Sequence, residues 1–253
     1  MFKAKFTFAK ACDIISLMND NLLQLESLLS EWYKTFGIDH VFYNVDSIER
    51  PVRNQVTQNK VVQTSKPTPS LNFSTLDELR NAVFKLDYPL KKMARNTVFS
   101  DGDPKSEIMI IGEAPGQEED EQGKPFVGQS GKLLNNMLAS IGLNRSDVYI
   151  SNILFWRPPG NRTPSAEEIA FCMPYVEQHV KLIHPKILLL LGGVAVKSIL
   201  NTSESISRLR GSKNTYLGIN TIATFHPAYL LRSPGQKALA FRDFISLRKI
   251  LSE

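Results

Sequence analysis

The sequence predicts an α/β protein, folded as a three-layer α/β/α sandwich around a four-stranded parallel sheet. Four apolar runs rich in branched residues recur along the chain, at residues 107–112, 148–155, 187–192 and 219–225. They are almost continuously apolar, which is typical of strands covered on both faces. Helical patterns separate the first three runs, and this alternation indicates parallel strands joined by crossover helices.

The predicted helices begin and end at recognisable signals. One helix has Pro164 at its first position and Glu167 and Glu168 in its first turn, a pattern typical of helix starts. It is expected to stop at His184, because a residue that precedes proline avoids helical backbone angles. Apolar residues at helical spacing predict two further helices, at residues 133–141 and from about 236 to 251.

The N-terminal part of the chain differs in composition from the rest. Residues 11–36 carry apolar side chains at helical spacing, so residues 1–50 are predicted to form a helical appendage. Residues 51–75 are rich in Gln, Thr, Ser, Lys and Pro, which is typical of a flexible linker. The α/β domain is therefore expected to occupy residues 76–253. We assign the appendage no chemistry, and a small docking helix is its simplest interpretation.

Composition and charge restrict the classes of function. The net charge of +5 and the pI of about 9.1 fit a polyanionic partner such as nucleic acid, without establishing one. Cys12 and Cys172 are the two cysteines, which argues against a disulfide framework and favours a reducing, cytoplasmic location. No apolar run approaches the roughly 18 residues of a membrane helix. We expect a monomer without membrane contact.

Polar side chains stand where the predicted strands end. Glu113 follows the first strand, Asn152 lies within the second and His226 follows the fourth. The carboxyl ends of parallel strands share one edge of a sheet, so these side chains are expected to converge there. A carboxylate, an amide and an imidazole together can activate water and hydrogen-bond a heterocycle. Structural alternatives are a helix cap or an ion pair with Lys132 for Glu113, a satisfied core amide for Asn152, and a turn histidine for His226.

A glycine-rich segment connects the first strand to the next helix. It contains Gly112-Glu113-Ala114-Pro115-Gly116, then Gly123-Lys124-Pro125-Phe126-Val127-Gly128, then Ser130-Gly131-Lys132. Glycines allow close backbone approach and a helix N-terminus offers free N–H groups, so the segment suits an anion or a planar ligand. It is not a P-loop, because Phe126 and Leu133 stand where that motif requires Gly and Ser or Thr. It also lacks the spacing of a dinucleotide site, and no His, Cys or Asp spacing suggests zinc.

Together these motifs resemble the family 4 uracil-DNA glycosylases, within the uracil-DNA glycosylase superfamily. The resemblance covers about residues 84–251 and includes, besides the glycine-rich segment with Glu119-Asp120, the runs Ser151-Asn152, Arg157-Pro158-Pro159-Gly160-Asn161-Arg162 and His226-Pro227-Ala228. The family fold is a small α/β/α sandwich around a four-stranded parallel sheet, in agreement with the strands described above. The resemblance implies an enzyme that excises uracil from DNA by hydrolysing the N-glycosidic bond, leaving an abasic site.

The resemblance also implies how the base is recognised once it has left the stack. Phe126 would stack on the uracil face, and the Asn152 amide would read the N3–H and O4 edge. The backbone around Gly112 and Ala114 would contact the base as well. Cytosine presents the reversed donor and acceptor pattern, so it would leave buried polar groups unpaired and be rejected.

Two residues are implied to act on the bond that breaks. His226 would donate a hydrogen bond to uracil O2 as negative charge builds on the leaving base. Glu113 would position water and favour the cationic sugar. Contacts to the DNA strand are implied for a phosphate-binding turn at a helix start, two arginines and a leucine wedge: Gly128, Ser130, Gly131, Arg162, Arg232, and Leu230 or Leu231.

One departure from the family concerns its [4Fe–4S] cluster, which four cysteines hold. The matching positions here are Lys85, Tyr88, Trp156 and Cys172, so one cysteine remains. Because a cluster needs four ligands, we expect no metal or other cofactor, with Tyr88 and Trp156 filling its space. Two alternatives stay open: a cluster-less relative that binds uracil-containing DNA weakly or without catalysis, and an enzyme that prefers another deaminated base such as hypoxanthine.

Overall fold

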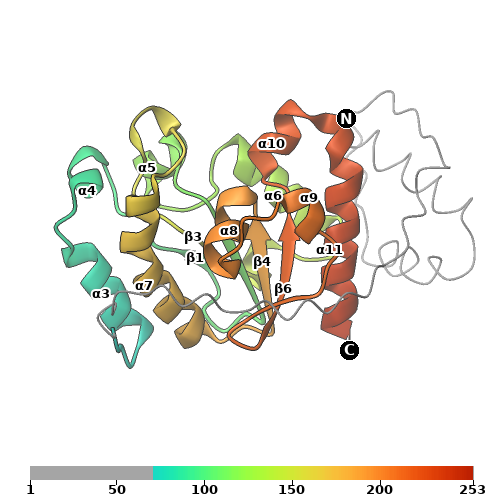
Figure 1. Ribbon diagram of the computed structural model, residues 1–253, viewed down its shortest axis with the longest axis horizontal. Helices are drawn as coiled ribbons and strands as arrows, with labels where there is room; N and C mark the ends of the chain where they lie inside the picture. The colour runs from blue at the N-terminus through green and yellow to red at the C-terminus, as the bar shows by residue number, and fades with distance from the viewer. Residues whose placement is uncertain (1–70, 253) are drawn as a thin grey trace, which may run out of the picture.

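The computed structural model describes residues 71–252, which form one sheet between two layers of helices (Figure 1). The helical pattern at residues 11–36, the appendage 1–50 and the linker up to residue 70 lie outside the described residues. Residues 71–75 lead directly into α3 (Leu76–Lys85), the first helix of the described residues, whose N-cap is Thr75. The described residues overlap the predicted α/β domain, whose bounds stay a prediction.

Within residues 71–252 the sheet has six strands, in the order β1-β3-β2-β4-β6-β5. Its four central strands run parallel, which confirms the predicted four-stranded parallel sheet: β2 (Ile108–Gly112), β3 (Tyr149–Asn152), β4 (Ile187–Leu191) and β6 (Ile219–Thr224). Two antiparallel edge strands, β1 (Asp101–Gly102) and β5 (Asn214–Tyr216), were not predicted. They have two and three residues, too few to produce an apolar run in the sequence.

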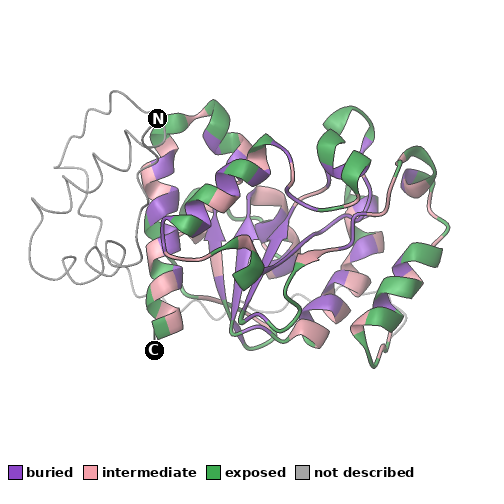
Figure 2. Cartoon of the chain, turned by 180° about the vertical axis from the view of Figure 1, so that it is seen from behind, coloured by how far each residue is buried: buried purple, intermediate pink, exposed green. Residues whose placement is uncertain are grey.

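Helices cover both faces of the sheet, as the continuous apolar strands required. On one face Ile108 and Ile110 of β2 pack with the apolar sides of α6 (Gln129–Ala139) and α11 (Lys237–Ser252). On the other face Met109 and Ile111 belong to a second core with α3, α7 (Ala166–Ile183) and α8 (Gly193–Leu200). Figure 2 shows the strands buried and the surrounding helices exposed in part.

Short helices and turns connect these layers at the carboxyl edge of the sheet and along its sides. They are α4 (Pro89–Met93), α5 (Gln117–Gln122), α9 (Ile206–Leu209), α10 (Pro227–Arg232), and the 3-10 turns Arg145–Asp147, Pro159–Asn161 and Pro234–Gln236. Figure 1 shows α5 and α10 at the upper end of the molecule, the end toward which the central strands run. Within residues 71–252, no helix is long and apolar enough to cross a membrane.

Helix α7 begins two residues later than predicted. Pro164 lies before the helix, and Ser165 is the N-cap whose hydroxyl accepts a hydrogen bond from the Glu168 N–H at 3.2 Å. The Glu168 carboxylate in turn accepts one from the Ser165 N–H at 2.8 Å, which completes a capping box. This reciprocal pair sets the first residue of the helix more strongly than proline does. The predicted stop is confirmed, because His184 is the C-cap in left-handed conformation.

Candidate active site at the carboxyl edge of the sheet

A cavity of about 720 Å³ opens at the carboxyl ends of the central strands. Glu113, Asn152 and His226 line it from the ends of β2, β3 and β6, and Phe126 lines it from the loop before α6. The parallel strands bring together groups that are up to 113 residues apart, since 226 − 113 = 113. The cavity thus combines a carboxylate, an aromatic ring, an amide and an imidazole.

Asn152 is the buried polar group at the centre of this site. It is the last residue of β3 and only 2 % exposed, and its Oδ1 atom accepts no hydrogen bond from any described residue. Leaving a buried acceptor unpaired costs about 1–3 kcal/mol, so the satisfied core amide is not what the structure contains. Gly112 makes room for it, because a Cβ there would lie 2.4 Å from Asn152 Oδ1 and 2.5 Å from Phe126 Cζ.

Phe126 forms a flat wall beside this amide. It is 5 % exposed, and its ring centroid lies 5.5 Å from that of His226. Its backbone is left-handed, with φ of 51°, which costs a non-glycine residue of the order of 1–3 kcal/mol. An aromatic face held in an unfavourable backbone conformation beside an unpaired amide is suited to stacking on a planar, hydrogen-bonding ligand.

His226 presents a fixed donor to the cavity. It is the N-cap of α10, and its Nδ1 accepts a hydrogen bond from the Ala228 N–H at 3.1 Å. This bond assigns the ring proton to Nε2. Burial, helped by the nearby positive charge of Arg232, lowers the pKa of His226 to about 4, so the ring is neutral at pH 7. Gly192, with φ of 93°, packs on this ring, since a Cβ there would lie 3.0 Å from His226 Cβ.

Glu113 follows β2 directly and is half-buried. Burial raises the pKa of its carboxyl, and no neighbouring charge opposes that shift. Among the described residues Glu113 has no ion pair with Lys132, and it caps no helix, so neither structural alternative is present. The site therefore holds a carboxyl group that takes up its proton at a higher pH than a free glutamate and that forms no ion pair with a described residue.

The residues implied to contact DNA surround the cavity with unequal exposure. Gly128 is the N-cap of α6, and Ser130 lines the cavity from the first turn of that helix. Gly131 is buried, and a Cβ there would lie 1.9 Å from the Phe126 carbonyl oxygen, so its place in the structure is a packing position. Arg162 lines the cavity and forms two hydrogen bonds with the Glu168 carboxylate, at 2.9 and 2.6 Å.

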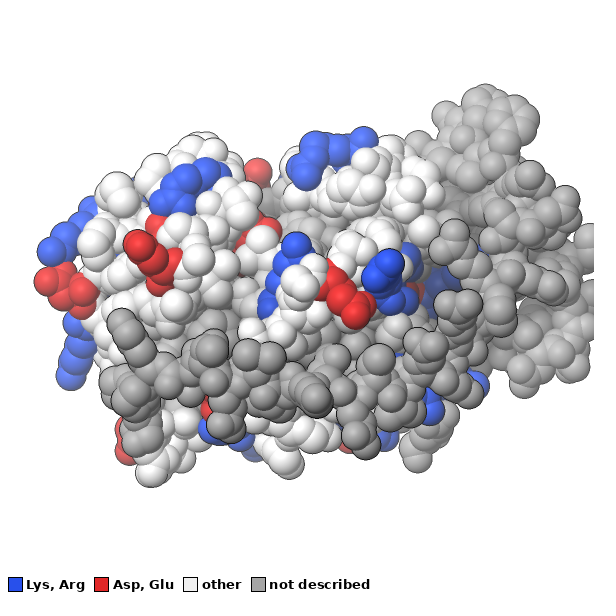
Figure 3. Space-filling model, viewed as in Figure 1, with Lys and Arg blue, Asp and Glu red and all other residues white. Residues whose placement is uncertain are grey.

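Helix α10 separates the two leucines that the sequence left as alternatives. Leu230 is fully buried in the core, so of the two alternatives it is not the one at the surface. Leu231 is 44 % exposed, and Tyr229 and Arg232, both exposed and on the same helix, line the cavity. Figure 3 shows basic side chains on both sides of a hollow at the upper edge of this face, over α10 and on the side of α5.

Several residues of the site were missed by sequence reasoning. Ile206 and Ser207 of α9 line the cavity, and Glu119 and Arg145 hold the loop that carries Phe126. Glu119 stands three residues after Gly116, a capping-box spacing that could have identified it. Arg145 lies 19 residues after its partner Phe126, and no local pattern predicts such a contact.

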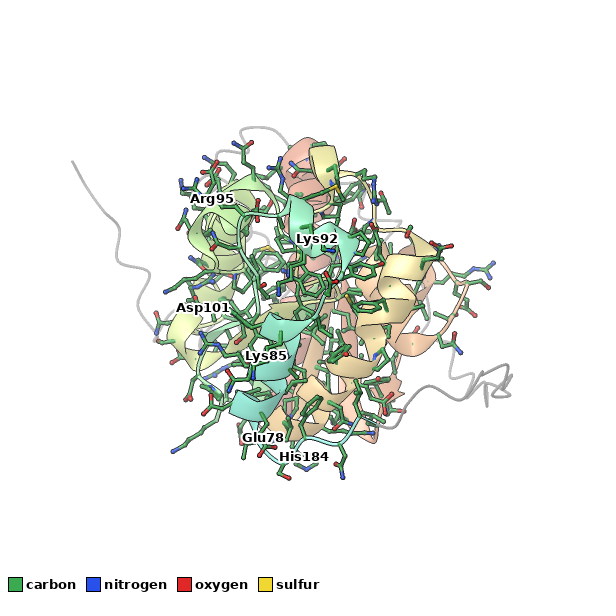
Figure 4. The ribbon with its side chains drawn as sticks, turned by 90° about the vertical axis from the view of Figure 1, so that its left-hand side faces the viewer. Glu78, Lys85, Lys92, Arg95, Asp101 and His184 are labelled. Carbon is green, nitrogen blue, oxygen red and sulfur yellow. The ribbon has the colours of Figure 1, made fainter. Side chains whose placement is uncertain are left out.

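The positions that match the family's cluster ligands do not fit a metal cluster. Lys85 is exposed at the end of α3 (Figure 4), and Tyr88 stacks on Phe171 with ring centroids 4.0 Å apart. Trp156 is fully buried, 6.0 Å from the Tyr88 ring. Burial raises the pKa of the Cys172 thiol to about 12. In the described part of the chain, no three His, Cys, Asp or Glu residues are grouped to hold a metal ion.

Comparison with known proteins gives a consistent result. The family model described as "Uracil DNA glycosylase superfamily" matches residues 99–246. The chain is 40 % identical over 164 residues to a type-4 uracil-DNA glycosylase of Sulfurisphaera tokodaii, covering 61 % of this chain and 74 % of that protein. It is 43 % identical to one of Archaeoglobus fulgidus, covering 61 % and 82 %, and 41 % identical to one of Thermotoga maritima, covering 57 % and 77 %.

Proposed function

The chain belongs to the uracil DNA glycosylase superfamily, and from this premise we propose that it excises uracil from DNA by hydrolysing the N-glycosidic bond. The observation that carries the proposal is the unpartnered Asn152 Oδ1, buried beside the Phe126 ring in a cavity at the carboxyl edge of the sheet. A base inside a duplex cannot reach such an atom, so the nucleotide must first leave the stack.

Recognition of uracil follows from the amide and the ring. Uracil has a donor at N3–H and an acceptor at O4, which suit Asn152 Oδ1 and Nδ2 respectively. Phe126 supplies a face on which the base stacks, and the backbone beside it belongs to Gly112 and Ala114. Cytosine presents an acceptor at N3 and a donor at N4, so in this orientation it leaves buried polar groups unpaired and is rejected.

Bond cleavage requires stabilisation of both fragments. As the bond between N1 of the base and C1′ of the sugar breaks, the electron pair stays with uracil and negative charge develops at O2. The Nε2–H of His226 is a preorganised, neutral donor for that oxygen. The sugar becomes cationic, and the Glu113 carboxylate faces it and orients the water that adds to C1′. The water that adds to C1′ loses a proton, and this proton balances the negative charge on the departed base, so the products are neutral uracil and an abasic site.

DNA binding outside the pocket uses the groups around its rim. The N–H groups at the start of α6, with the Ser130 hydroxyl, suit a phosphate. Arg232 and Arg162 are the expected phosphate partners, although Arg162 must share its charge with Glu168. Leu231 is the exposed side chain available to occupy the space that the flipped base leaves.

We infer that this enzyme works without an iron–sulfur cluster. Relatives of its type usually carry a [4Fe–4S] cluster, but a tyrosine, a tryptophan and an exposed lysine occupy three of the four ligand positions here. Aromatic packing replaces the bracing that a cluster would give. Iron analysis and an absorption spectrum of the active, purified protein test this; stoichiometric iron in the active fraction would refute it.

The decisive experiment measures uracil release from an oligonucleotide with a single uracil, followed by cleavage of the abasic site. Wild-type protein is expected to release the base, while Asn152→Ala and His226→Ala lower the rate about 10²–10³-fold. Glu177→Gln, which removes only a surface ion pair with Lys181 on α7, is the matched control and should retain full rate. Binding of uracil-containing DNA without release would instead identify a non-catalytic relative, and preferential release of hypoxanthine would change the substrate.

The organisation of the enzyme completes the proposal. We propose that residues 76–253 form the glycosylase domain and act as a monomer, because one chain supplies every group of the cavity. Residues 1–50 and 51–75 remain proposed as appendage and linker. A cytoplasmic location fits a protein with two cysteines that acts on DNA. Mass measurement in solution tests the monomer.

A further inference from the structure

The loop that carries Phe126 holds a conformation that its sequence does not favour. Phe126 has a φ of 51°, in the left-handed region that side chains with a Cβ avoid. Such a conformation persists only where surrounding groups enforce it. The loop leads into α6 and places the ring against Asn152 and His226, so the groups that enforce it also set the shape of the pocket.

Glu119 holds the loop from the side of α5. Its Oε1 accepts hydrogen bonds from the N–H groups of Val127 at 3.0 Å and Gly128 at 2.9 Å. Its Oε2 accepts one from the Gly116 N–H at 3.1 Å. The carboxylate is buried and joins the two ends of the glycine-rich segment, fixing the residues that directly follow Phe126.

Arg145 holds the same loop from the opposite side. Its two terminal nitrogens donate to the carbonyl oxygens of Phe126 at 2.8 Å and Pro125 at 2.5 Å. Its Nε donates to the carboxylate of Asp101, an edge-strand residue labelled in Figure 4, at 2.7 Å. A planar guanidinium can bind two neighbouring carbonyls and a carboxylate at once, whereas an ammonium group offers no such fixed fork.

We propose that Glu119 and Arg145 are positioning residues that form a clamp around Phe126 and thereby preorganise the face on which the base stacks. The inference rests on the proposed function for the nature of the ligand, whereas the clamp itself rests on the hydrogen bonds. Arg145 does not line the cavity, and Glu119, which does, accepts backbone N–H groups at both of its carboxylate oxygens, so we assign both residues to the position of Phe126. The absent Cβ of Gly131 leaves the Phe126 carbonyl in reach of Arg145.

A double-mutant cycle distinguishes positioning from a general loss of stability. Arg145→Lys, Phe126→Ala and the double variant are compared in kcat/KM for uracil release, with concentrations corrected for the folded fraction. Arg145→Lys is expected to lower kcat/KM about tenfold or more in the wild-type background, but less than about twofold in the Phe126→Ala background, since coupled residues are non-additive. Equal losses in both backgrounds would overturn the proposal.

Thr75→Ala is the structural control. Thr75 is the N-cap of α3, and its hydroxyl accepts a hydrogen bond from the Glu78 N–H at 3.2 Å, on a helix that packs against α7 and does not line the cavity. It is expected to lower the melting temperature while leaving kcat/KM per folded molecule unchanged. A loss of kcat/KM in this variant equal to that of Arg145→Lys would assign the effect to stability and refute the clamp.

Hydrogen exchange tests the clamp without any activity. In Glu119→Ala the amides of Val127 and Gly128 lose their acceptor and should exchange about tenfold or more faster, while Thr75→Ala leaves them unchanged. Unaltered exchange at both amides in Glu119→Ala would refute the clamp. If wild-type protein releases no base, the proposed function fails, and this measurement alone then decides the inference.

Discussion

Two neighbouring regions of this molecule differ in whether their buried groups are satisfied by hydrogen bonds and close packing. The pocket leaves Asn152 Oδ1 without a partner among the described residues and holds Phe126 in a strained backbone conformation. The region where relatives hold a cluster, which we call the aromatic plug (Tyr88, Trp156, Phe171 and Cys172), is closed. Its Trp156 indole N–H donates to Thr97 Oγ1 at 2.9 Å, and its rings pack against one another.

The difference is instructive because both regions depend on one short segment. Asn152 ends β3, and Trp156 lies four residues later in the same buried run. Unpaired groups such as Asn152 Oδ1 destabilise the free protein and are useful only to a ligand. Close aromatic packing stabilises the fold but leaves no group available to bind a ligand. We infer that the plug supplies stability beside a site that lowers it, and five predictions test this contrast.

The largest expected effect is on stability, from the plug. Trp156→Ala leaves a cavity in a fully buried position and should lower the free energy of unfolding by about 3–5 kcal/mol. The kcat/KM per folded molecule should change less than about threefold, because Trp156 does not line the pocket. Denaturant titration with Trp156→Phe as the milder control checks this. Undiminished stability would mean that the plug is not what braces this end of the fold.

Asn152→Ala should show the reverse behaviour. Removing the amide lowers kcat/KM about 10²–10³-fold, because uracil then loses its hydrogen-bonding partner. The free energy of unfolding should fall by less than about 1 kcal/mol, since the lost oxygen had no partner to begin with. Calorimetry and single-turnover kinetics on the same preparation measure both quantities. A stability loss as large as that of Trp156→Ala would make Asn152 a structural residue.

The third prediction concerns pH. Burial raises the pKa of Glu113, so this carboxyl takes up its proton at a higher pH than free glutamate. We expect kcat to fall as the pH decreases through a value above 4.5. The Glu113→Gln variant should be much slower, and its kcat should no longer fall in that pH range. The pKa of His226 is about 4, so its ring stays neutral above that pH and causes no further change in kcat there. A pH-independent wild-type rate between 4.5 and 7 would exclude an essential Glu113 carboxylate.

The same variant bears on stability. Because the folded-state pKa of Glu113 is raised, its charged form is disfavoured on folding, and this cost is present above the folded pKa. Glu113→Gln should therefore be more stable than wild type at pH 7, with the difference vanishing as the pH falls below the unfolded-state pKa. A lower stability at pH 7 would show that the carboxylate holds the fold together.

The fold was predictable because its determinants are local, whereas the site was predictable only in part. Continuous apolar runs and the capping residues identify the central strands and α7 from short windows of sequence. Strand ends then place Glu113, Asn152 and His226 on one edge, and the structure brings them to one cavity. Two of the misses have the same physical reason: the edge strands are only two and three residues long, so they carry no apolar pattern.

Contacts between individual loops were not predictable from sequence. The bond from Arg145 to Phe126 joins two loops, and nothing near either residue indicates the other. Leu230 and Leu231 are indistinguishable by type, and only their phase on α10 decides that Leu230 is buried and Leu231 exposed. Which side of a six-residue helix is buried depends on the elements that pack against it. The sequence of the helix itself does not carry that information.

The smallest expected effect lies at the rim of the pocket, where charges are exposed and screened by salt. Arg232→Gln should weaken binding of uracil-containing DNA moderately and reduce the slope of log affinity against log salt by about one phosphate contact. Lys186→Gln, an exposed cation directly before β4 at the opposite edge of the sheet, is the matched control and should leave the slope unchanged. Equal slopes for wild type and Arg232→Gln would remove this arginine from the DNA interface, and equal changes in both variants would mean that net charge alone attracts DNA. Either outcome would leave the pocket intact, because recognition of the base depends on neutral, buried groups that salt does not screen.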